Sequence, residues 1–288
     1  MEIRKNVDLD SRLAQKVTTL KAILEAKRAL LVAFSGGVDS SFLLAVASEV
    51  LSGNVVALMT VSPSTPPQDA KQATQLAKKL SVELLSIQHN ELVIPEYRAN
   101  PVNRCYFCKN SLYEICRATA ERLSLPAIAD GVNLDDLGDY RPGLQAAEEC
   151  GVFHPLVEAR FTKEEIRQAS RVLGLRTWSK PASPCLSSRV PYGTRITAKM
   201  LLQISQAESF LQTLGVEQLR VRYNGQTARI EIDKRALSKF TSQRTLRAIG
   251  QQLRGLGIPL VTLDLEGYKS GVFNVGLKVT RPRTTVFA

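Results

Sequence analysis

The sequence predicts an α/β protein, in which a doubly wound parallel sheet is followed by a smaller C-terminal α+β domain. Through the first two thirds of the chain, apolar runs of strand length alternate with amphipathic segments of helical length, which is typical of parallel β-α-β units. After Thr194 the pattern changes, and two short alternating runs meet at Asn224-Gly225, which is typical of a hairpin. We therefore expect one domain over residues 1–193 and a second over 194–288.

The elements follow from these periods in chain order. Leu13, Val17, Leu20, Ile23 and Leu24 recur at helical spacing and predict a helix over residues 11–27. For the first domain we expect strands over 31–34, 54–61, 82–88 and 127–131, with further helices over 42–51, 68–80, 110–123 and 163–173. For the second we expect helices over 198–214 and 234–256, and strands over 218–223, 227–232 and 260–265.

The segment between the first strand and the next helix has the features of a phosphate-binding loop. Gly36 and Gly37 can take positive φ and bring backbone N–H groups close to an anion, and the positive end of the following helix points to the same place. Asp39 can hold Mg²⁺ that bridges phosphate oxygens. The loop has neither a Gly-Lys-Ser/Thr ending nor the Gly-x-Gly-x-x-Gly spacing. The residues expected at the nucleotide are Ser35, Gly36, Gly37, Val38, Asp39, Ser40 and Ser41.

Ser35-Gly36-Gly37-Val38-Asp39-Ser40 resembles the PP-loop of the ATP pyrophosphatases. These enzymes cleave ATP between its α and β phosphates and adenylate a substrate. The resemblance implies ATP and Mg²⁺ as ligands at the carboxyl ends of the parallel strands, where open α/β sheets bind ligands. The alternative is an ordinary glycine turn between a strand and a helix.

Three of the five cysteines stand in positions that indicate chemistry. Cys105 and Cys108 are spaced to bind one metal or cluster, or to form a redox pair, and the alternative is a pair of buried thiols. Cys185 lies in a proline-rich loop between Lys180 and Arg189, and nearby cations favour the reactive thiolate. We expect Cys116 and Cys150 to pack in the core, and His89 and His154 to be structural.

An acidic loop follows the fourth predicted strand. Asp135, Asp136 and Asp139 lie within five residues of one another, near the expected ligand crevice, and Arg141 follows them. The loop either positions a metal or substrate, with Arg141 on an anion, or is solvated, with Asp as a helix cap. Arg220 and Arg222 share one face of a later strand and either bind a phosphate or are solvated.

Composition and charge favour a globular protein and exclude few partners. The chain has 288 residues, of which 44% are hydrophobic and 23% are charged, as in globular proteins. The net charge of +11 fits a nucleic-acid partner or a mononucleotide site, and the basic residues form no long run. The charged N-terminus and the lack of an eighteen-residue apolar run indicate no signal peptide and no membrane span. We therefore expect a cytoplasmic protein.

Three stretches together resemble the LarE family: the PP-loop, Asp130 to Gly143, and Lys180 to Arg189. These ATP-dependent sulfur transferases adenylate a carboxylate of a pyridinium dicarboxylate mononucleotide and convert it to a thiocarboxylate, for the nickel-pincer cofactor of lactate racemase. The resemblance covers nearly the whole chain, and it implies a hexamer and a small-molecule nucleotide substrate. It also implies roles near the substrate or between subunits for Glu208, Arg220, Arg222 and Glu231, and we assign Arg189 to the substrate as well.

The family resemblance implies two possible sulfur sources. In one branch a single cysteine that matches Cys185 gives up its own sulfur, and in another three cysteines bind a [4Fe–4S] cluster that carries an extra sulfide. Cys105, Cys108 and Cys185 match the three-cysteine branch, and three thiolates leave one iron open for sulfide. Alternative functions are a tRNA thiolase, an ATP-dependent amidating enzyme of the NAD-synthetase type, and an ATP-binding iron–sulfur sensor without turnover.

Overall fold

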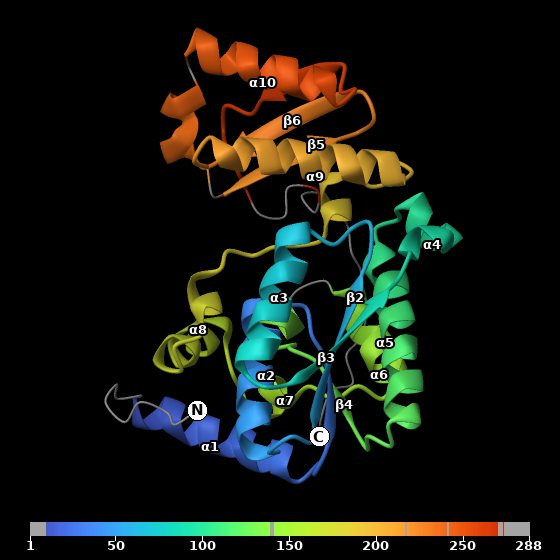
Figure 1. Cartoon of the computed structure of the whole chain (residues 1–288), viewed down its shortest axis with the longest axis vertical. Helices are drawn as coiled ribbons and strands as arrows, with labels where there is room; N and C mark the ends of the chain where they lie inside the picture. Colours follow the sequence, from blue (N-terminus) through green and yellow to red (C-terminus); the bar gives the residue numbers. More distant parts are fainter. Residues whose placement is uncertain (1–9, 139–140, 217, 241, 270–272, 274–288) are drawn as a thin grey trace. The chain divides into compact units, whose positions relative to one another are not determined.

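The computed structural model describes residues 10–138, 141–216, 218–240, 242–269 and 273 (Figure 1). The chain divides into two compact units, one formed by residues 1–188 with 195–201 and the other by residues 189–194 with 202–288. The domain boundary between residues 193 and 194 stays a prediction. In the described part of the chain, no helix is both long and apolar enough to cross a membrane.

The first unit is built on a four-stranded parallel sheet, which confirms the predicted fold class. Its strands are β1 (Leu30–Ala33), β2 (Val55–Val61), β3 (Glu83–Gln88) and β4 (Ile128–Ala129), in the order β3-β2-β1-β4. All four residues of β1 are buried. A strand of a parallel sheet is apolar throughout when helices cover both faces.

Successive side chains of β1 point to opposite faces and pack into two different apolar clusters. Leu30 and Val32 belong to one cluster, and Leu31 and Ala33 to the other. The first cluster includes residues of α1 (Ser11–Glu25), α2 (Val38–Val50), α3 (Pro67–Lys79), α7 (Pro155–Glu158) and α8 (Lys163–Val172), and the second includes residues of α5 (Arg104–Arg122) and α6 (Pro142–Glu149).

Short helices complete the first unit. They are α4 (Pro95–Ala99) and the 3-10 helices η1 (Glu91–Val93), η2 (Leu134–Gly138), η3 (Arg176–Ser179) and η4 (Leu186–Arg189), the last of which continues into the second unit at Arg189.

Two helices begin earlier than the sequence predicted. α2 begins at Val38 rather than Phe42, and α5 begins at Arg104 rather than Asn110. Apolar periodicity marks only the packed part of a helix, whereas polar first turns face the site and escape that signal. Cys105 and Cys108 therefore lie within α5 rather than before it.

The second unit contains a three-stranded sheet with the order β5-β6-β7. β5 (Leu219–Tyr223) and β6 (Thr227–Ile232) form the predicted antiparallel hairpin, and β7 (Leu260–Leu263) pairs parallel with β6. Its helices are α9 (Ala198–Thr213), of which residues 198–201 belong to the first unit, and α10 (Gln243–Gly255).

The single helix predicted over residues 234–256 was wrong. The chain forms the 3-10 helix η5 (Lys234–Phe240) and then α10. Ser242 caps α10, because its hydroxyl accepts a hydrogen bond from the backbone N–H of Thr245. A serine cap satisfies one of the N–H groups that a new helix leaves without an intrahelical partner.

Candidate functional site

The loop between β1 and α2 is closed by its own hydroxyl groups. Ser35 Oγ lies 3.0 Å from Ser40 Oγ, and the backbone N–H of Gly37 donates to Ser35 Oγ at 3.3 Å. Gly36 has φ +68°, and a Cβ on it would lie 2.8 Å from the Cβ of Ala73 in α3. Position 36 therefore requires glycine both for its backbone conformation and for packing.

The first turn of α2 offers backbone donors to an anion. The expectation that both glycines take positive φ was wrong for Gly37, which is extended at φ −77° and caps the helix. The N–H groups of Val38, Asp39 and Ser40 have no intrahelical carbonyl partner, because they belong to the first turn. Together with the positive helix end, they form a site suited to phosphate oxygens.

Asp39 is held by two neighbours from distant parts of the chain. The Lys163 ammonium forms an ion pair with Asp39 Oδ2, and Asn133 Nδ2 donates to Asp39 Oδ1 at 3.4 Å. Lys163 is the first residue of α8 and was not predicted as a site residue. A Mg²⁺ ion on Asp39 would therefore share this carboxylate with Lys163 or displace the ammonium.

Lys180 forms a second cationic contact with the loop. Its ammonium donates to the Gly36 carbonyl oxygen at 3.1 Å and pairs with Asp69 of α3 at 2.9 Å. Ser183 also donates to Asp69, at 2.7 Å. The segment before Cys185 is thus tied to the nucleotide loop.

The activation of Cys185 by its flanking cations stays a prediction, and each of the two cations also pairs with a carboxylate. Lys180 pairs with Asp69, and Arg189 pairs with Glu208 in the second unit. Sequence neighbours can thus be committed elsewhere, because irregular segments carry successive side chains in different directions.

The end of β4 packs against the first turn of α2. A Cβ on Gly131 would lie 2.7 Å from the backbone nitrogen of Ser40. The preceding residue, Asp130, is buried and accepts hydrogen bonds from Tyr113 Oη at 2.5 Å and from the backbone N–H of Val132 at 3.1 Å, while His154 Nδ1 lies 2.7 Å away. His154 is therefore structural, as predicted, and orients a carboxylate beside the loop.

Opposing influences act on Asp130. Burial by itself raises the pKa of its carboxyl group, but the hydrogen bond and charge of His154, the Lys109 ammonium and the Tyr113 hydrogen bond lower the pKa below its ordinary value. Asp130 belongs to a stretch that resembles the family. Its partners Tyr113 of α5 and His154 at the start of α7 could not be predicted from the sequence.

The acidic loop contributes two described carboxylates. Asp135 Oδ2 accepts a hydrogen bond from the backbone N–H of Lys163 at 2.8 Å, and Asp136 pairs with Arg141 at 2.7 Å. Burial raises the pKa of Asp136, although Arg141 opposes this effect. Asp139 lies outside the described residues. Asp135 and Asp136 connect the loop to α8 and α6 rather than being simply solvated.

The three predicted thiols all belong to the first unit. Cys105 and Cys108 lie at i and i+3 in α5, which places them on one side of the helix. Cys105 is exposed, whereas Cys108 and Cys185 are partly buried. Burial, with a contribution from the nearby Cys185, raises the pKa of Cys108 to about 12. The same two causes raise the pKa of Cys105, although Arg104 opposes this increase. The thiols are therefore close enough to interact electrostatically.

The [4Fe–4S] cluster at Cys105, Cys108 and Cys185 stays a prediction. Among the described residues, no three His, Cys, Asp or Glu side chains converge closely enough to hold one metal ion. Cys116 is fully buried, as predicted, and Cys150 donates a weak hydrogen bond to Asn110 Oδ1 at 3.8 Å.

The predicted substrate residues lie in the second unit, where they form a buried ionic network. Arg189 donates to both Glu208 oxygens, at 3.0 and 2.9 Å, and Glu208 Oε1 also accepts from the backbone N–H of Val221. Arg222 pairs with Glu231 at 3.0 Å. Arg220 and Arg222 are buried, which contradicts the alternative that they are solvated, and phosphate binding stays a prediction. Buried guanidinium groups are suited to bidentate binding of phosphate or carboxylate.

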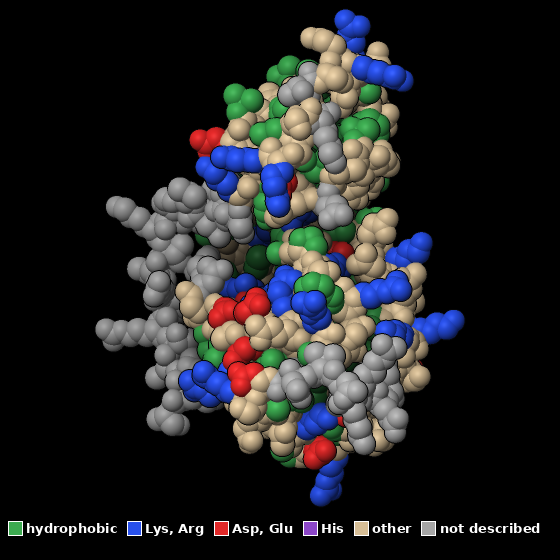
Figure 2. Space-filling model, turned by 90° about the vertical axis from the view of Figure 1, so that its left-hand side faces the viewer, with side chains coloured by type: hydrophobic (Ala, Val, Ile, Leu, Met, Phe, Trp, Pro, Cys, Tyr) green, Lys and Arg blue, Asp and Glu red, His purple; other side chains and the backbone are tan. Residues whose placement is uncertain are grey.

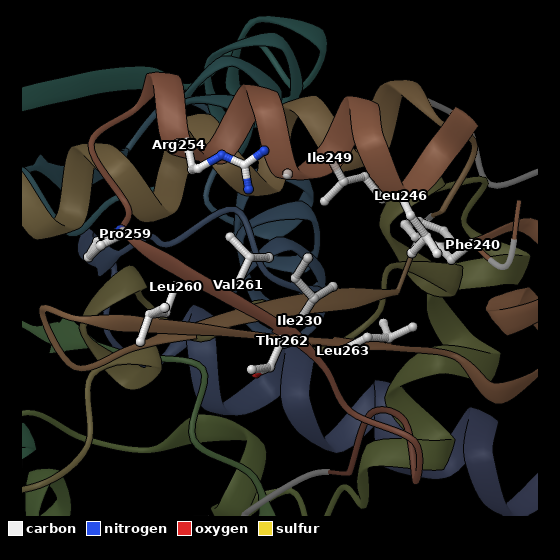
Figure 3. A pocket seen from close by; sticks show the side chains of 11 residues that line it. Ile230, Phe240, Leu246, Ile249, Arg254, Pro259, Leu260, Val261, Thr262 and Leu263 are labelled. Atoms are coloured by element: carbon white, nitrogen blue, oxygen red, sulfur yellow. The ribbon is translucent and has the colours of Figure 1, made fainter. Parts of the chain in front are cut away.

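An apolar cavity of about 390 Å³ lies elsewhere in the second unit, between α10 and β7 (Figure 3). Leu246 and Ile249 line it from the helix, and Val261 and Leu263 line it from the strand. Arg254 is its one charged lining side chain among the described residues. The lining has no thiol or carboxylate and includes none of the predicted site residues.

Comparisons with known proteins agree with the nucleotide-binding loop. A family model described as NAD synthase matches residues 9–99. Pyridinium-3,5-bisthiocarboxylic acid mononucleotide synthase of Lactiplantibacillus plantarum is 35% identical over 96% of this chain and 99% of its own length. Uncharacterised proteins of Synechocystis sp. and Methanocaldococcus jannaschii are 44% and 29% identical, over 91% and 89% of this chain and 98% of each relative.

Proposed function

Because the chain belongs to the LarE family of ATP-dependent sulfur transferases, we propose that it converts a carboxylate of a pyridinium dicarboxylate mononucleotide into a thiocarboxylate. The reaction serves biosynthesis of the nickel-pincer nucleotide cofactor. The observation that carries this proposal is the 35% identity with the synthase of that product class over 96% of the chain.

In the first stage, a substrate carboxylate oxygen attacks the α-phosphorus of ATP and pyrophosphate leaves. The backbone N–H groups of residues 38–40 and the cations Lys163 and Lys180 bind and orient the phosphates, and Asp39 would hold Mg²⁺. The product is an acyl adenylate, whose AMP leaves far more readily than an oxide ion would. Fixed positive charge at the departing pyrophosphate stabilises the transition state.

In the second stage, sulfur bonds to the acyl carbon and the C–O bond to AMP breaks. The sulfur comes either from a sulfide held at Cys105, Cys108 and Cys185 or from Cys185 itself. A [4Fe–4S] cluster would supply an open iron that carries an exchangeable sulfide. The donor set of three electrostatically interacting thiols supports assignment of these cysteines as its ligands.

The second unit supplies the binding groups proposed for the substrate. Arg189, Arg220 and Arg222 are the proposed ligands, and Arg189 and Arg222 also pair with Glu208 and Glu231. The phosphate of a mononucleotide would accept charge-assisted hydrogen bonds from these guanidinium groups. We also propose a homo-oligomer, with six subunits as in the family.

The test separates the two stages. Anaerobically purified protein is supplied with iron, sulfide, ATP, Mg²⁺ and pyridinium-3,5-dicarboxylate mononucleotide, and pyrophosphate and thiocarboxylate are measured. Asp39→Ala should abolish both products, whereas Cys185→Ala should release pyrophosphate and form no thiocarboxylate. Ammonia-dependent amide formation without sulfur incorporation would overturn the proposal in favour of an amidating enzyme.

The same reaction identifies the sulfur source. Intact-mass measurement after one turnover should show unchanged Cys185 if sulfide is the donor, and dehydroalanine at position 185 if the cysteine gives up its sulfur.

A further inference from the structure

A buried polar cluster joins the segment that carries Cys185 to the helix that carries Cys105 and Cys108. The hydroxyl of Ser187, two residues after Cys185, lies 2.6 Å from Tyr97 Oη. The carbonyl oxygen of Ser187 accepts a hydrogen bond from Arg104 at 3.0 Å. Arg104 directly precedes Cys105. The two thiol-bearing segments are thus connected by side chains that are adjacent to the thiols in sequence.

The cluster is shielded from water and extends beyond these contacts. Tyr97, Arg104 and Ser187 are buried. Tyr97 Oη also donates to Glu91 Oε1 at 3.3 Å, and Arg104 also donates to Asn100 Oδ1. Asn100 is buried in a left-handed conformation, φ +58°, at the turn between α4 and α5. Among residues with a side chain, Asn is one of the few that adopt this conformation as single residues.

Stability alone does not account for this arrangement. Burying hydroxyl, guanidinium and carboxylate groups is costly, and apolar residues of similar volume are often as stable or more stable. Glu91 Oε2 is buried and has no hydrogen-bond partner among the described residues. A polar network of this kind does fix one geometry, because each hydrogen bond restricts both distance and angle.

The segment that carries Cys185 is irregular, so side-chain contacts rather than a helix or strand hold it in place. Residues 180–185 have no regular secondary structure, and η4 begins directly after Cys185. Besides the Ser187 contacts, Lys180 and Ser183 bind Asp69, and the backbone N–H of Leu186 donates to the Ser64 carbonyl oxygen at 2.8 Å. Reactive groups must approach to about 3–3.5 Å, and a shift of about 1 Å costs roughly 100-fold in rate.

We propose that Tyr97, Arg104 and Ser187 are positioning residues that hold Cys185 at a fixed distance from Cys105 and Cys108. This inference rests on the proposed function, since the spacing matters when the three thiols bind one group or exchange sulfur. Tyr97 and Ser187 act through the hydrogen bond between their hydroxyl groups. Arg104 binds the carbonyl oxygen of Ser187 and so links the Cys185 segment to the first turn of α5.

The test measures the thiol spacing directly in the full-length, reduced, metal-free protein. Dibromobimane links two thiols when both displace bromide from the same molecule, and peptide mass spectrometry identifies the linked pair. In the wild type we expect links from Cys185 to Cys105 or Cys108. Tyr97→Phe and Ser187→Ala should each lower the rate of linking at least about fivefold, because each removes one hydroxyl and keeps the side-chain shape.

Two controls show whether a lower linking rate comes from a changed distance between the thiols rather than from misfolding or lower thiol reactivity. Tyr113→Phe removes an equally buried hydroxyl from α5 whose partner is Asp130, so it should leave the linking rate unchanged. Monobromobimane, which modifies one thiol at a time, should react at wild-type rates with all variants. The double variant should link no more slowly than either single variant, since both remove the same hydrogen bond.

The positioning role also predicts a spectroscopic effect. After reconstitution with iron and sulfide, Tyr97→Phe and Ser187→Ala should change the electron paramagnetic resonance spectrum of the reduced protein, and Tyr113→Phe should not. Wild-type linking rates in folded Tyr97→Phe and Ser187→Ala proteins would overturn the inference. A wild type that forms no thiocarboxylate, combined with slowed linking in these variants, would refute the proposed function and leave the positioning role intact.

Discussion

Lys180 connects two parts of the proposed chemistry, because its ammonium contacts the nucleotide loop and its backbone leads to Cys185. The contacts with the Gly36 carbonyl oxygen and with Asp69 leave only 14% of its side chain exposed. A cation at this place reduces the repulsion between ATP phosphates and the carboxylates around the loop.

Replacement of this cation should weaken ATP use. A charge-assisted hydrogen bond contributes about 1.5–3 kcal/mol, so Lys180→Ala should lower kcat/KM for ATP by roughly 10- to 100-fold in the pyrophosphate-release assay. Lys21→Ala is the control, because Lys21 is 26% exposed and pairs with Glu49 rather than with a residue at the nucleotide site. Equal losses in the two variants would contradict a specific role for Lys180.

Asp130 gives the stability of the protein a predictable pH dependence. Its folded pKa is below the unfolded value of about 3.9. The ionised carboxylate therefore stabilises the fold above the unfolded pKa, and this contribution is lost as the pH falls through the folded pKa.

Tyr113→Phe removes one of the hydrogen bonds that lower the pKa of Asp130. We expect the variant to be less stable than the wild type by about 1.5–3 kcal/mol at pH 7, with a smaller difference below pH about 4, where protonation removes the charge-assisted part. Urea unfolding at several pH values measures this difference. Tyr223→Phe is the control, because its partner is the carbonyl oxygen of Gly225, which does not titrate. A Tyr113→Phe difference that stays constant with pH would contradict the assignment.

The start of α8 couples a helix cap to the nucleotide site. Thr162 and Glu165 form a reciprocal capping box, as the sequence predicted. The cap fixes the first turn, and the first residue of that turn is Lys163, which reaches Asp39. The same local motif therefore stabilises the helix and sets the position of a cation at the loop.

Thr162→Ala should lower both stability and ATP use. Loss of the cap costs about 0.5–2 kcal/mol, measured by urea unfolding, and KM for ATP should rise as Lys163 loses its fixed position. Thr74→Ala is the control, since the Thr74 hydroxyl contacts only the carbonyl oxygen of Ala70 on an exposed helix surface. A cap variant with normal KM would show that α8 is positioned by packing alone.

The charge of the whole molecule bears on the tRNA alternative. The chain carries 38 Lys and Arg and 27 Asp and Glu. On the face drawn in Figure 2, basic side chains are scattered and a group of acidic side chains lies among them. Several of the buried arginines are already paired with carboxylates. Nucleic-acid enzymes instead present clustered positive charge that neutralises several phosphates.

We expect only weak and nonspecific binding of tRNA. Filter binding should give a Kd in the range of about 10⁻⁴–10⁻⁶ M near physiological salt, with similar values for tRNA and for an unrelated duplex DNA. Binding of tRNA that is tighter than this range and at least tenfold tighter than that of the duplex would contradict the small-molecule assignment and favour a tRNA thiolase.

The sequence alone determined the strands of both sheets, the fold class and the position of the nucleotide loop. Apolar runs of β1 and β2 have the length and composition of strands buried on both faces, and Asn224-Gly225 marks the hairpin in the second unit. The loop was identifiable because its chemistry depends on backbone geometry, which six consecutive residues encode locally. The three thiols were identifiable because few residue types bind metals or carry sulfur.

Only the tertiary structure decided which side chains meet around these residues. Lys163 contacts Asp39, which is 124 residues away in sequence, and Ser187 contacts Tyr97 over a separation of 90 residues. Parallel strands bring the ends of distant segments to one edge of a sheet, so contacts there carry no short-range sequence period. Lys180 and Arg189 flank Cys185 in the sequence, whereas folding directs each to a different carboxylate.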